Sequence, residues 1–262
     1  MCLPLSYLHY HFPHGVKAFS TCRDGGCSRG AYASFNCTHY CGDEAGHVVA
    51  NRRILCDDWQ IAPDCLIIPR QVHGTKVAVV DADFMALLPT IRTERLDGVD
   101  ALVSPLSGIC LAVSTADCIP ILIYDSRTRV MAAVHAGWRG TVAGIVSLTL
   151  RQMKTLYGTE GKDVHAAIGP GISLDAFEVG DEVYETFYSA GFPMDQIAVR
   201  REKWHIDLWA ANRLQLLDEG LRLDAIEMSG ICTWLQVDRF FSARRLGVNS
   251  GRILTGIMQV NK

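Results

Sequence analysis

The stretch IPILIYDSRTRVMAAVHAGWRG, residues 119–140, decides the fold because it joins two apolar runs through turn-forming residues. Such a pattern predicts a β-hairpin. With a two-residue loop at 126–127, the predicted register places Cys118 directly opposite His135. Side chains opposed in this way share one face, with Cβ atoms about 5 Å apart. A bulge at Pro120 is the alternative, and it would shift this register by one residue.

Short β-branched runs predict further strands around this hairpin. The predicted strands are 65–69, 76–81, 99–104, 108–114, 120–125, 129–136, 163–169 and 252–260. Helical periodicity predicts helices over 44–59, 139–157, 180–190 and 207–219, the last with Asp207 as its N-cap. Several strands follow one another with only turns between them, so we expect an α/β (α+β) fold with largely antiparallel sheets and helices outside. Evenly spread turn signals predict a single domain over 1–262, with 1–15 as a loosely ordered N-terminal segment.

Composition excludes several classes of protein. The chain has 262 residues, 49% of them hydrophobic, and a net charge of −3, which gives no electrostatic case for nucleic acid or an anionic membrane. No apolar run reaches the ~20 residues of a membrane helix. The start of the chain lacks the pattern of a signal peptide, so a cytoplasmic location is expected. The ten cysteines form no C-x-x-C pair, which argues against a zinc ribbon, and a disulfide framework is not expected.

Three side chains suggest a reactive centre at the open end of the hairpin. Cys118 follows an acidic residue, His135 precedes the sequence Gly-Trp-Arg-Gly, and His73 is followed by glycine between two predicted strands. Two histidines and a cysteine suit a zinc site with an open fourth position. Cys118 and His135 also suit a nucleophile pair, in which the imidazole lowers the thiol pKa. The third interpretation is that both are ordinary core residues.

A series of motifs then points to a family. In order, the chain contains FSTCRDGGCSRGAYASFN, CGD, NRRIL, QVHG, DALVS, TADCIP, VHAGWRG, IGPGIS, FEVGDEV, DLWAANRLQL, CT and FFSARR. The sequence resembles the YfiH family of laccase-domain proteins from about residue 16 to the C-terminus. The pairing of TADCIP with HAGWRG is its most specific part. One departure is Cys22, which stands before Arg23 where the family has arginine directly after FST.

The resemblance implies a metal centre, a fold and a chemistry. The implied ligands are His73, Cys118 and His135, holding zinc, with copper as an alternative. The implied fold is a layered α/β/β/α sandwich. The implied substrates are purine nucleosides, with phosphate, in the phosphorolysis of adenosine, inosine and methylthioadenosine to base and ribose 1-phosphate. Adenosine deamination is a second implied activity. We expect no nucleic-acid or membrane partner, and either a monomer or a homodimer.

The two implied reactions need further catalytic and binding groups, and the sequence contains candidates for them. Deamination needs an activated water and a proton shuttle, for which Asp117 and Glu178 are candidates. Phosphorolysis needs a bound phosphate, and Arg139 at a predicted helix start suits an anion. Gly169 belongs to a predicted tight loop at the rim of the substrate site. Asn36, Arg52 and Glu178 are further predicted substrate-binding residues.

Three other functions remain as alternatives. Copper-dependent polyphenol oxidation is one, although a laccase uses repeated H-x-H pairs and the chain has one, at His9 and His11. A Cys–His hydrolase or amidase acting on cell-wall precursors is the second. The third is a non-catalytic binding protein with a structural metal, for which no fourth protein ligand stands out.

Overall fold

Two packed sheets form the body of the protein. The structure, a computed structural model, describes residues 5–13 and 15–260. The larger sheet has six strands in the order β13 (Ile226–Met228), β9 (Val164–Ile168), β7 (Ile119–Asp125), β8 (Val130–Ala136), β5 (Ala101–Ser104) and β4 (Val77–Val79). The second has five strands in the order β1 (Tyr7–His9), β2 (Val16–Thr21), β14 (Ile253–Gln259), β6 (Cys110–Thr115) and β3 (Leu66–Ile67).

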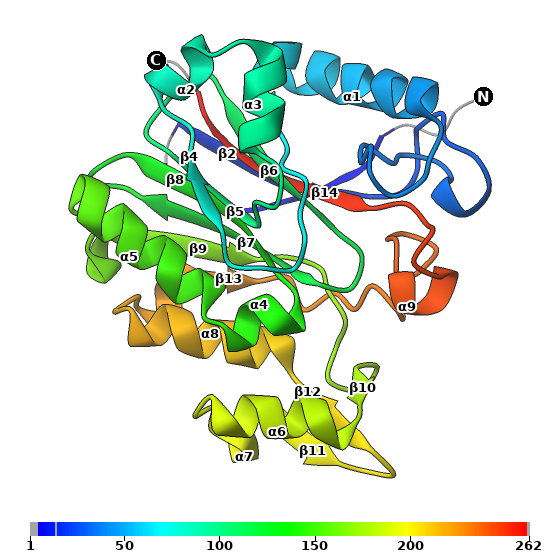
Figure 1. The fold of residues 1–262 in the computed structure, drawn as a ribbon, viewed down its shortest axis with the longest axis vertical. Coiled ribbons are helices and arrows are strands. Elements are labelled where there is room, and N and C mark those ends of the chain that lie inside the picture. The colour runs from blue at the N-terminus through cyan, green and yellow to red at the C-terminus, as the bar shows by residue number, and fades with distance from the viewer. Residues whose placement is uncertain (1–4, 14, 261–262) are drawn as a thin grey trace.

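Successive side chains along each strand point to opposite faces of the sheet, and this alternation produces three apolar layers. Leu102, Leu122 and Ala133 of the six-stranded sheet pack against residues such as Leu111 and Ile257 of the five-stranded sheet. The intervening residues of the same strands face the helices α5 (Ile145–Tyr157) and α8 (Leu208–Asp218). The outer face of the five-stranded sheet packs against α1 (Ala45–Trp59). Figure 1 shows α1 and α5 on opposite sides of the two sheets, which gives the predicted α/β/β/α layering.

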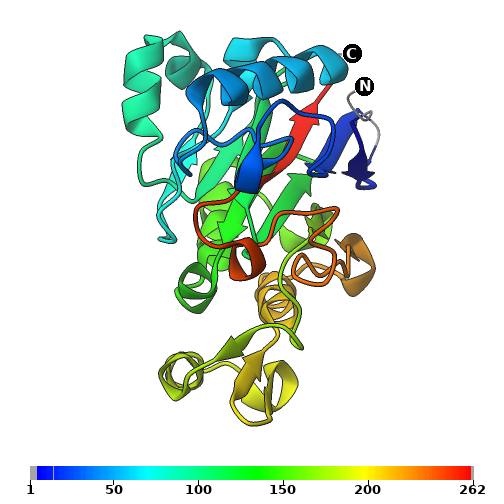
Figure 2. The same cartoon turned by 90° about the vertical axis from the view of Figure 1, so that its right-hand side faces the viewer.

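A smaller sheet extends from this body. It has the order β10 (Glu178–Val179), β12 (Trp204–Ile206) and β11 (Ala198–Arg200), with the helices α6 (Asp181–Ser189) and α7 (Met194–Ile197) beside it. Figure 2 shows this group at the bottom of the molecule, away from α1. The remaining helices are α2 (Ala82–Ala86), α3 (Pro89–Arg95), α4 (Trp138–Val142) and α9 (Ala243–Leu246). No helix within the described residues has both the length and the apolar character needed to cross a membrane.

Most predicted elements are confirmed. Each of the eight predicted strands and the four predicted helical regions contains an element of that type, and Asp207 caps α8 by accepting from the Ala210 amide. Most strand pairs are antiparallel, whereas β13–β9, β3–β6 and β4–β5 are parallel. The predicted helix over 139–157 is divided into α4 and α5 because Gly144 adopts a left-handed φ of 75°. Within the segment 1–15, residues Tyr7–His9 pair with β2, while residues 1–4 and 14 lie outside the described residues.

The predicted hairpin register is wrong. Pro120, not Cys118, pairs with His135, and no bulge separates β7 from β8. The cause is a four-residue turn at 126–129, in which the buried Asp125 carboxylate accepts hydrogen bonds from the Arg127 and Thr128 amides. The register therefore moves by two residues. A shift of two preserves the face on which each side chain lies, so Cys118 still lies on the same side as His135.

Candidate metal centre

The three predicted ligands converge in space. The donor atoms of His73, Cys118 and His135 all lie within 4.8 Å of one another, and they form the one such group of three or more metal-binding side chains among the described residues. The two imidazole rings are 4.9 Å apart between centroids and nearly perpendicular, at 75°. These nitrogen and sulfur donors match the ligands that zinc takes in proteins, with a fourth position left open.

Three different segments supply these ligands. His135 lies near the end of β8, Cys118 immediately precedes β7, and His73 lies in the loop between β3 and β4. His135 is buried, Cys118 is half-buried and His73 is exposed. The centre therefore has one side inside the sheet and one side toward solvent, as access for a small molecule requires.

Asp100, which the sequence analysis did not select, holds two of the ligands in place. Its buried carboxylate lies 2.8 Å from His135 Nδ1 and accepts hydrogen bonds from the amides of Val72, His73 and Gly74. An ionised carboxylate only accepts, so Nδ1 of His135 carries a proton, and Nε2 is the nitrogen left to bind a metal ion. A carboxylate behind a ligating histidine in this way fixes the tautomer and the orientation of the ring.

The backbone around the centre adopts conformations that side chains rarely take. His73 has a φ of 64° and Asp117, next to Cys118, has a φ of 85°. Non-glycine residues in this region cost free energy and are found where the surrounding contacts enforce them. Gly137 is also required, because a β-carbon there would lie 2.9 Å from His73 Cδ2 and 3.0 Å from Cys118 Sγ.

The electrostatic surroundings favour the thiolate of Cys118. Burial alone would raise the pKa of this thiol, but the charge and hydrogen bond of His135, together with His73, lower it below its ordinary value. Burial would raise the pKa of Asp100, yet the His135 contact and the backbone amides hold it below its ordinary value. A deprotonated cysteine beside oriented imidazoles is the state in which these residues bind a metal ion.

A cavity of about 560 Å³ opens above the three ligands. This volume lies within the range of cavities that bind small molecules. Besides the ligands, its walls are formed by Tyr40, Cys41, Gly42, Arg70, Gln71, Ser114, Thr115, Ala116, Ala243, Val248, Asn249 and Arg252. Two arginines and no carboxylate are among these residues. The Tyr40 hydroxyl and the Thr115 hydroxyl are buried without a hydrogen-bond partner among the described residues.

The two predicted proton shuttles are held by other groups. The Asp117 carboxylate accepts hydrogen bonds from the Thr233 hydroxyl and the Arg244 amide, both at 2.7 Å. It thereby ties the turn that contains Thr233 and the helix α9 to the segment that carries Cys118. Glu178 lies on β10 and forms an exposed ion pair with Lys203 at 2.8 Å. Neither residue lines the cavity above the metal centre.

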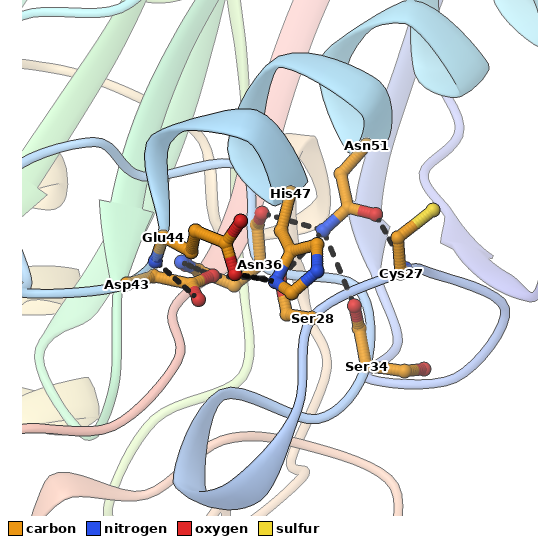
Figure 3. Close-up of polar contacts among 8 residues, drawn as sticks. All are labelled: Cys27, Ser28, Ser34, Asn36, Asp43, Glu44, His47 and Asn51. Atoms are coloured by element: carbon orange, nitrogen blue, oxygen red, sulfur yellow. Dashed lines mark hydrogen bonds and ion pairs between the residues drawn. The ribbon is translucent and has the colours of Figure 1, made fainter.

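Asn36 is a structural residue behind the cavity wall. It is fully buried, and its side chain contacts the Thr38 backbone, Asp43 and the Arg252 amide. Figure 3 shows the neighbouring Asn51 reaching from α1 toward this segment, where its side-chain amide donates to the Asn36 carbonyl. These hydrogen bonds position residues 40–42, which line the cavity.

The other predicted substrate-binding residues also lie outside this cavity. Gly169 is buried, and a β-carbon there would lie 2.8 Å from both Pro120 Cγ and the Tyr10 hydroxyl, so packing requires glycine. Arg139 is exposed, with its guanidinium 4.3 Å from the centre of the Trp138 ring. Arg52 lines a second cavity, described below.

Sequence reasoning missed Asp100 and the arginines of the cavity wall for a definable reason. Asp100 immediately precedes the buried strand β5, and an acidic residue that enters a buried strand needs partners. That signal was present in the sequence but did not identify His135 as the partner. Arg70 and Arg252 are far apart in the chain and meet only in the folded structure.

The fold and the three-donor centre together define a layered α/β protein in which three side chains that could hold a metal ion lie in the wall of a cavity. The family described as multi-copper polyphenol oxidoreductase laccase matches residues 17–260, and the chain belongs to this family. The predicted relationship to laccase-domain proteins is therefore confirmed.

Named relatives share almost the whole chain. A purine nucleoside phosphorylase of Bacteroides thetaiotaomicron is 51% identical over 93% of this chain and 91% of its own length. Adenosine deaminase RL5, from an unknown prokaryotic organism, is 45% identical over 93% of this chain and 94% of its own length. The crystal structure of YlmD from Geobacillus stearothermophilus superposes with a TM-score of 0.90 at 30% identity and covers 97% of this chain and 96% of that one.

Proposed function

We propose that this protein is a zinc-dependent purine nucleoside enzyme. Its reactions are the phosphorolysis of adenosine, inosine and methylthioadenosine, and the deamination of adenosine, both in the cytoplasm. The observation that carries the proposal is the convergence of three metal-binding side chains beside a cavity of about 560 Å³. Relatives at 51% and 45% identity that are named purine nucleoside phosphorylase and adenosine deaminase support this substrate class.

The donor set fits zinc. His73, Cys118 and His135 would hold the ion, and the favoured thiolate of Cys118 suits a borderline-soft metal. When bound, zinc supplies Lewis-acid catalysis without a change of oxidation state. Copper accepts the same nitrogen and sulfur donors, so the metal content has to be measured.

The chain's own residues would bind and orient the substrates. Arg70 and Arg252 place positive charge at the cavity wall, which favours a bound phosphate. In phosphorolysis a phosphate oxygen forms a bond to the ribose C1′ while the bond from C1′ to the base nitrogen breaks. The departing base then needs a proton.

Tyr40 is the residue in the wall that is suited to donate to the substrate. Burial raises the pKa of Tyr40 to about 12, so its hydroxyl keeps its proton at neutral pH. The hydroxyl is buried without a hydrogen-bond partner among the described residues, and Tyr40 is one of the residues that line the cavity of the three candidate ligands. We assign Tyr40 the role of a hydrogen-bond donor to the base.

Metal analysis combined with nucleoside assays tests the proposal. We expect zinc at about one ion per chain, ribose 1-phosphate from adenosine only when phosphate is present, and inosine from adenosine without phosphate. Cys118→Ser should abolish both activities, whereas Cys27→Ser, at an exposed cysteine outside the cavity, should retain them. Wild-type rates in Cys118→Ser would show that the site is assigned wrongly.

Assays on the same purified protein distinguish the alternative functions. Oxidation of a phenol only after copper loading, without a nucleoside product, would replace the proposal with polyphenol oxidation. Hydrolysis of a peptidoglycan precursor without a nucleoside product would replace it with the amidase function. A tightly held metal with no turnover of any of these substrates would indicate a binding protein.

A further inference from the structure

A second cavity lies beside the metal cavity and is lined by positive charge. It has a volume of about 380 Å³, and Arg70 lines both cavities. The second cavity is also lined by His39, Arg52 and Arg92, while Asp64 is the one carboxylate in its lining. Three guanidinium groups against one carboxylate leave a net positive charge in a concave site.

Arg52 is held in this cavity by neutral partners. Its Nε donates to the Cys37 carbonyl at 2.7 Å, and its Nη2 lies 2.9 Å from His39 Nδ1. A guanidinium only donates, so His39 Nδ1 accepts and His39 is neutral, with its proton on Nε2. Burial, followed by the charges of Arg52 and Arg70, also lowers the pKa of His39. Among the described residues Arg52 therefore has no carboxylate partner.

Arg92, which also lines this cavity, has one buried donor without a partner among the described residues. Its Nη1 donates to the Asp64 carbonyl at 3.2 Å, whereas its Nε is buried without a hydrogen-bond partner among the described residues. Arg70 differs, since it pairs with Asp97 at 2.9 Å. Arg52 and Arg92 are both half-buried and have no carboxylate partner among the described residues, so an anionic ligand would find two cations without a counter-charge.

We propose that this second cavity binds a phosphoryl group through Arg52, Arg92 and His39. A phosphoryl dianion accepts several hydrogen bonds at once, and guanidinium groups match its geometry. The volume exceeds what a phosphate ion fills, and Leu66, Ile67 and Leu96 provide an apolar wall. A small phosphomonoester, with its organic part against that wall, is therefore the ligand class that fits. This site is separate from the proposed metal chemistry and does not rest on it.

Calorimetric titration of the full-length protein tests this inference with three probes: inorganic phosphate, adenosine 5′-monophosphate and uncharged adenosine. We expect saturable binding of both phosphoryl compounds, weakened by added salt. Tighter binding of the monophosphate identifies a phosphomonoester site. Equal or exclusive binding of inorganic phosphate identifies a site for the free ion. No saturable binding of either compound would overturn the inference.

Matched variants test which residues bind the phosphoryl group. Arg52→Gln and Arg92→Gln should each weaken phosphoryl binding by about 10-fold or more, since each removes a charge-assisted hydrogen-bond donor. Arg53→Gln and Arg95→Gln are the controls, because they remove exposed arginines of the same helices that do not line the cavity. Unchanged affinity in both Arg52→Gln and Arg92→Gln would overturn the inference, and a thermal melt of each variant verifies folding.

A metal-site variant separates the two cavities. Cys118→Ser removes a ligand of the metal centre, and it should bind inorganic phosphate as tightly as the wild type. Loss of phosphate binding in that variant, with binding retained in Arg52→Gln, would place the phosphate in the metal cavity and overturn the inference. The nucleoside assays are independent of this result, so the two proposals can fail separately.

Discussion

The β7–β8 hairpin has a buried aspartate beside each of its two ends, and the two carboxylates have different roles. At the open end, Asp100 accepts from His135 and from the amides of residues 72–74. At the closed end, Asp125 accepts from Arg127 and from the amide and hydroxyl of Thr128. Both side chains are fully buried, and hydrogen bonds hold the pKa of each below its ordinary value despite burial.

The difference lies in where the donors come from. The hydrogen-bond donors to Asp125 at 2.6–3.1 Å belong to Arg127 and Thr128, so this carboxylate closes a local turn. The donors to Asp100 come from two segments about 60 residues apart, namely the loop of His73 and the strand of His135. A buried carboxylate with local partners therefore stabilises the fold, whereas one with distant partners can position a reactive group. The predictions below test this distinction.

The largest expected effect is on activity at the open end. His135→Ala should abolish stoichiometric metal binding and lower kcat/KM by about 1000-fold or more, because it removes the best-oriented ligand. Circular dichroism should show a folded protein. His11→Ala, at a side chain that is 93% exposed, is the matched control and should bind metal normally. Retention of one metal ion per chain in His135→Ala would contradict the assigned ligand set.

The next effect is on stability at the closed end. Asp125→Ala should lower the free energy of unfolding by about 2–4 kcal/mol, because it removes a fully buried side chain and leaves two turn amides without their acceptor. Metal content per folded chain should stay at the wild-type value. Asp163→Ala removes the partner of Arg127 at the same turn and should cost under about 1 kcal/mol. Urea denaturation measures the free energy of unfolding of both variants. Equal losses in Asp125→Ala and Asp163→Ala would show that Asp125 stabilises the turn no more than Asp163 does.

A smaller effect on metal affinity is expected from Asp100→Asn. The amide retains the shape of the side chain but accepts fewer hydrogen bonds, so His135 loses its fixed tautomer and metal affinity should fall about 10–100-fold. Competition with a chromophoric chelator measures this change. Asp83→Asn, at an exposed position, should leave affinity unchanged. An unaltered affinity in Asp100→Asn would mean that Asp100 supports only the fold, as Asp125 does.

The smallest effect is a pH dependence at the closed end. The pKa of Asp125 in the folded state is lowered from the ordinary value of 3.8. The stabilisation of the folded state by this carboxylate is therefore fully present above pH 3.8 and is lost as the pH falls through the folded-state pKa. The difference in unfolding free energy between wild type and Asp125→Ala should be constant at neutral pH and shrink below about pH 4. Denaturation curves at several pH values measure it, and a difference that grows in acid would contradict the lowered pKa.

Local chemistry explains why much of the fold could be predicted. Alternating and continuous apolar runs located the main strands, and Asp207 marked the start of α8 correctly. The candidate metal ligands could be grouped because Cys118 and His135 flank one hairpin. The register was wrong because the Asp125 side chain selects a four-residue turn, a contact that the turn composition alone did not reveal.

The sequence by itself determined the strands, the hairpin and the residue types that bind a metal, because these depend on neighbours along the chain. Only the tertiary structure decided the partners of Asp100, the structural role of Asn36 and the meeting of Arg52, Arg70 and Arg92 around a second cavity. Those arrangements depend on how α1, the β3–β4 loop and α3 pack together. Packing places side chains from distant segments side by side, and no periodic pattern along the chain predicts such contacts.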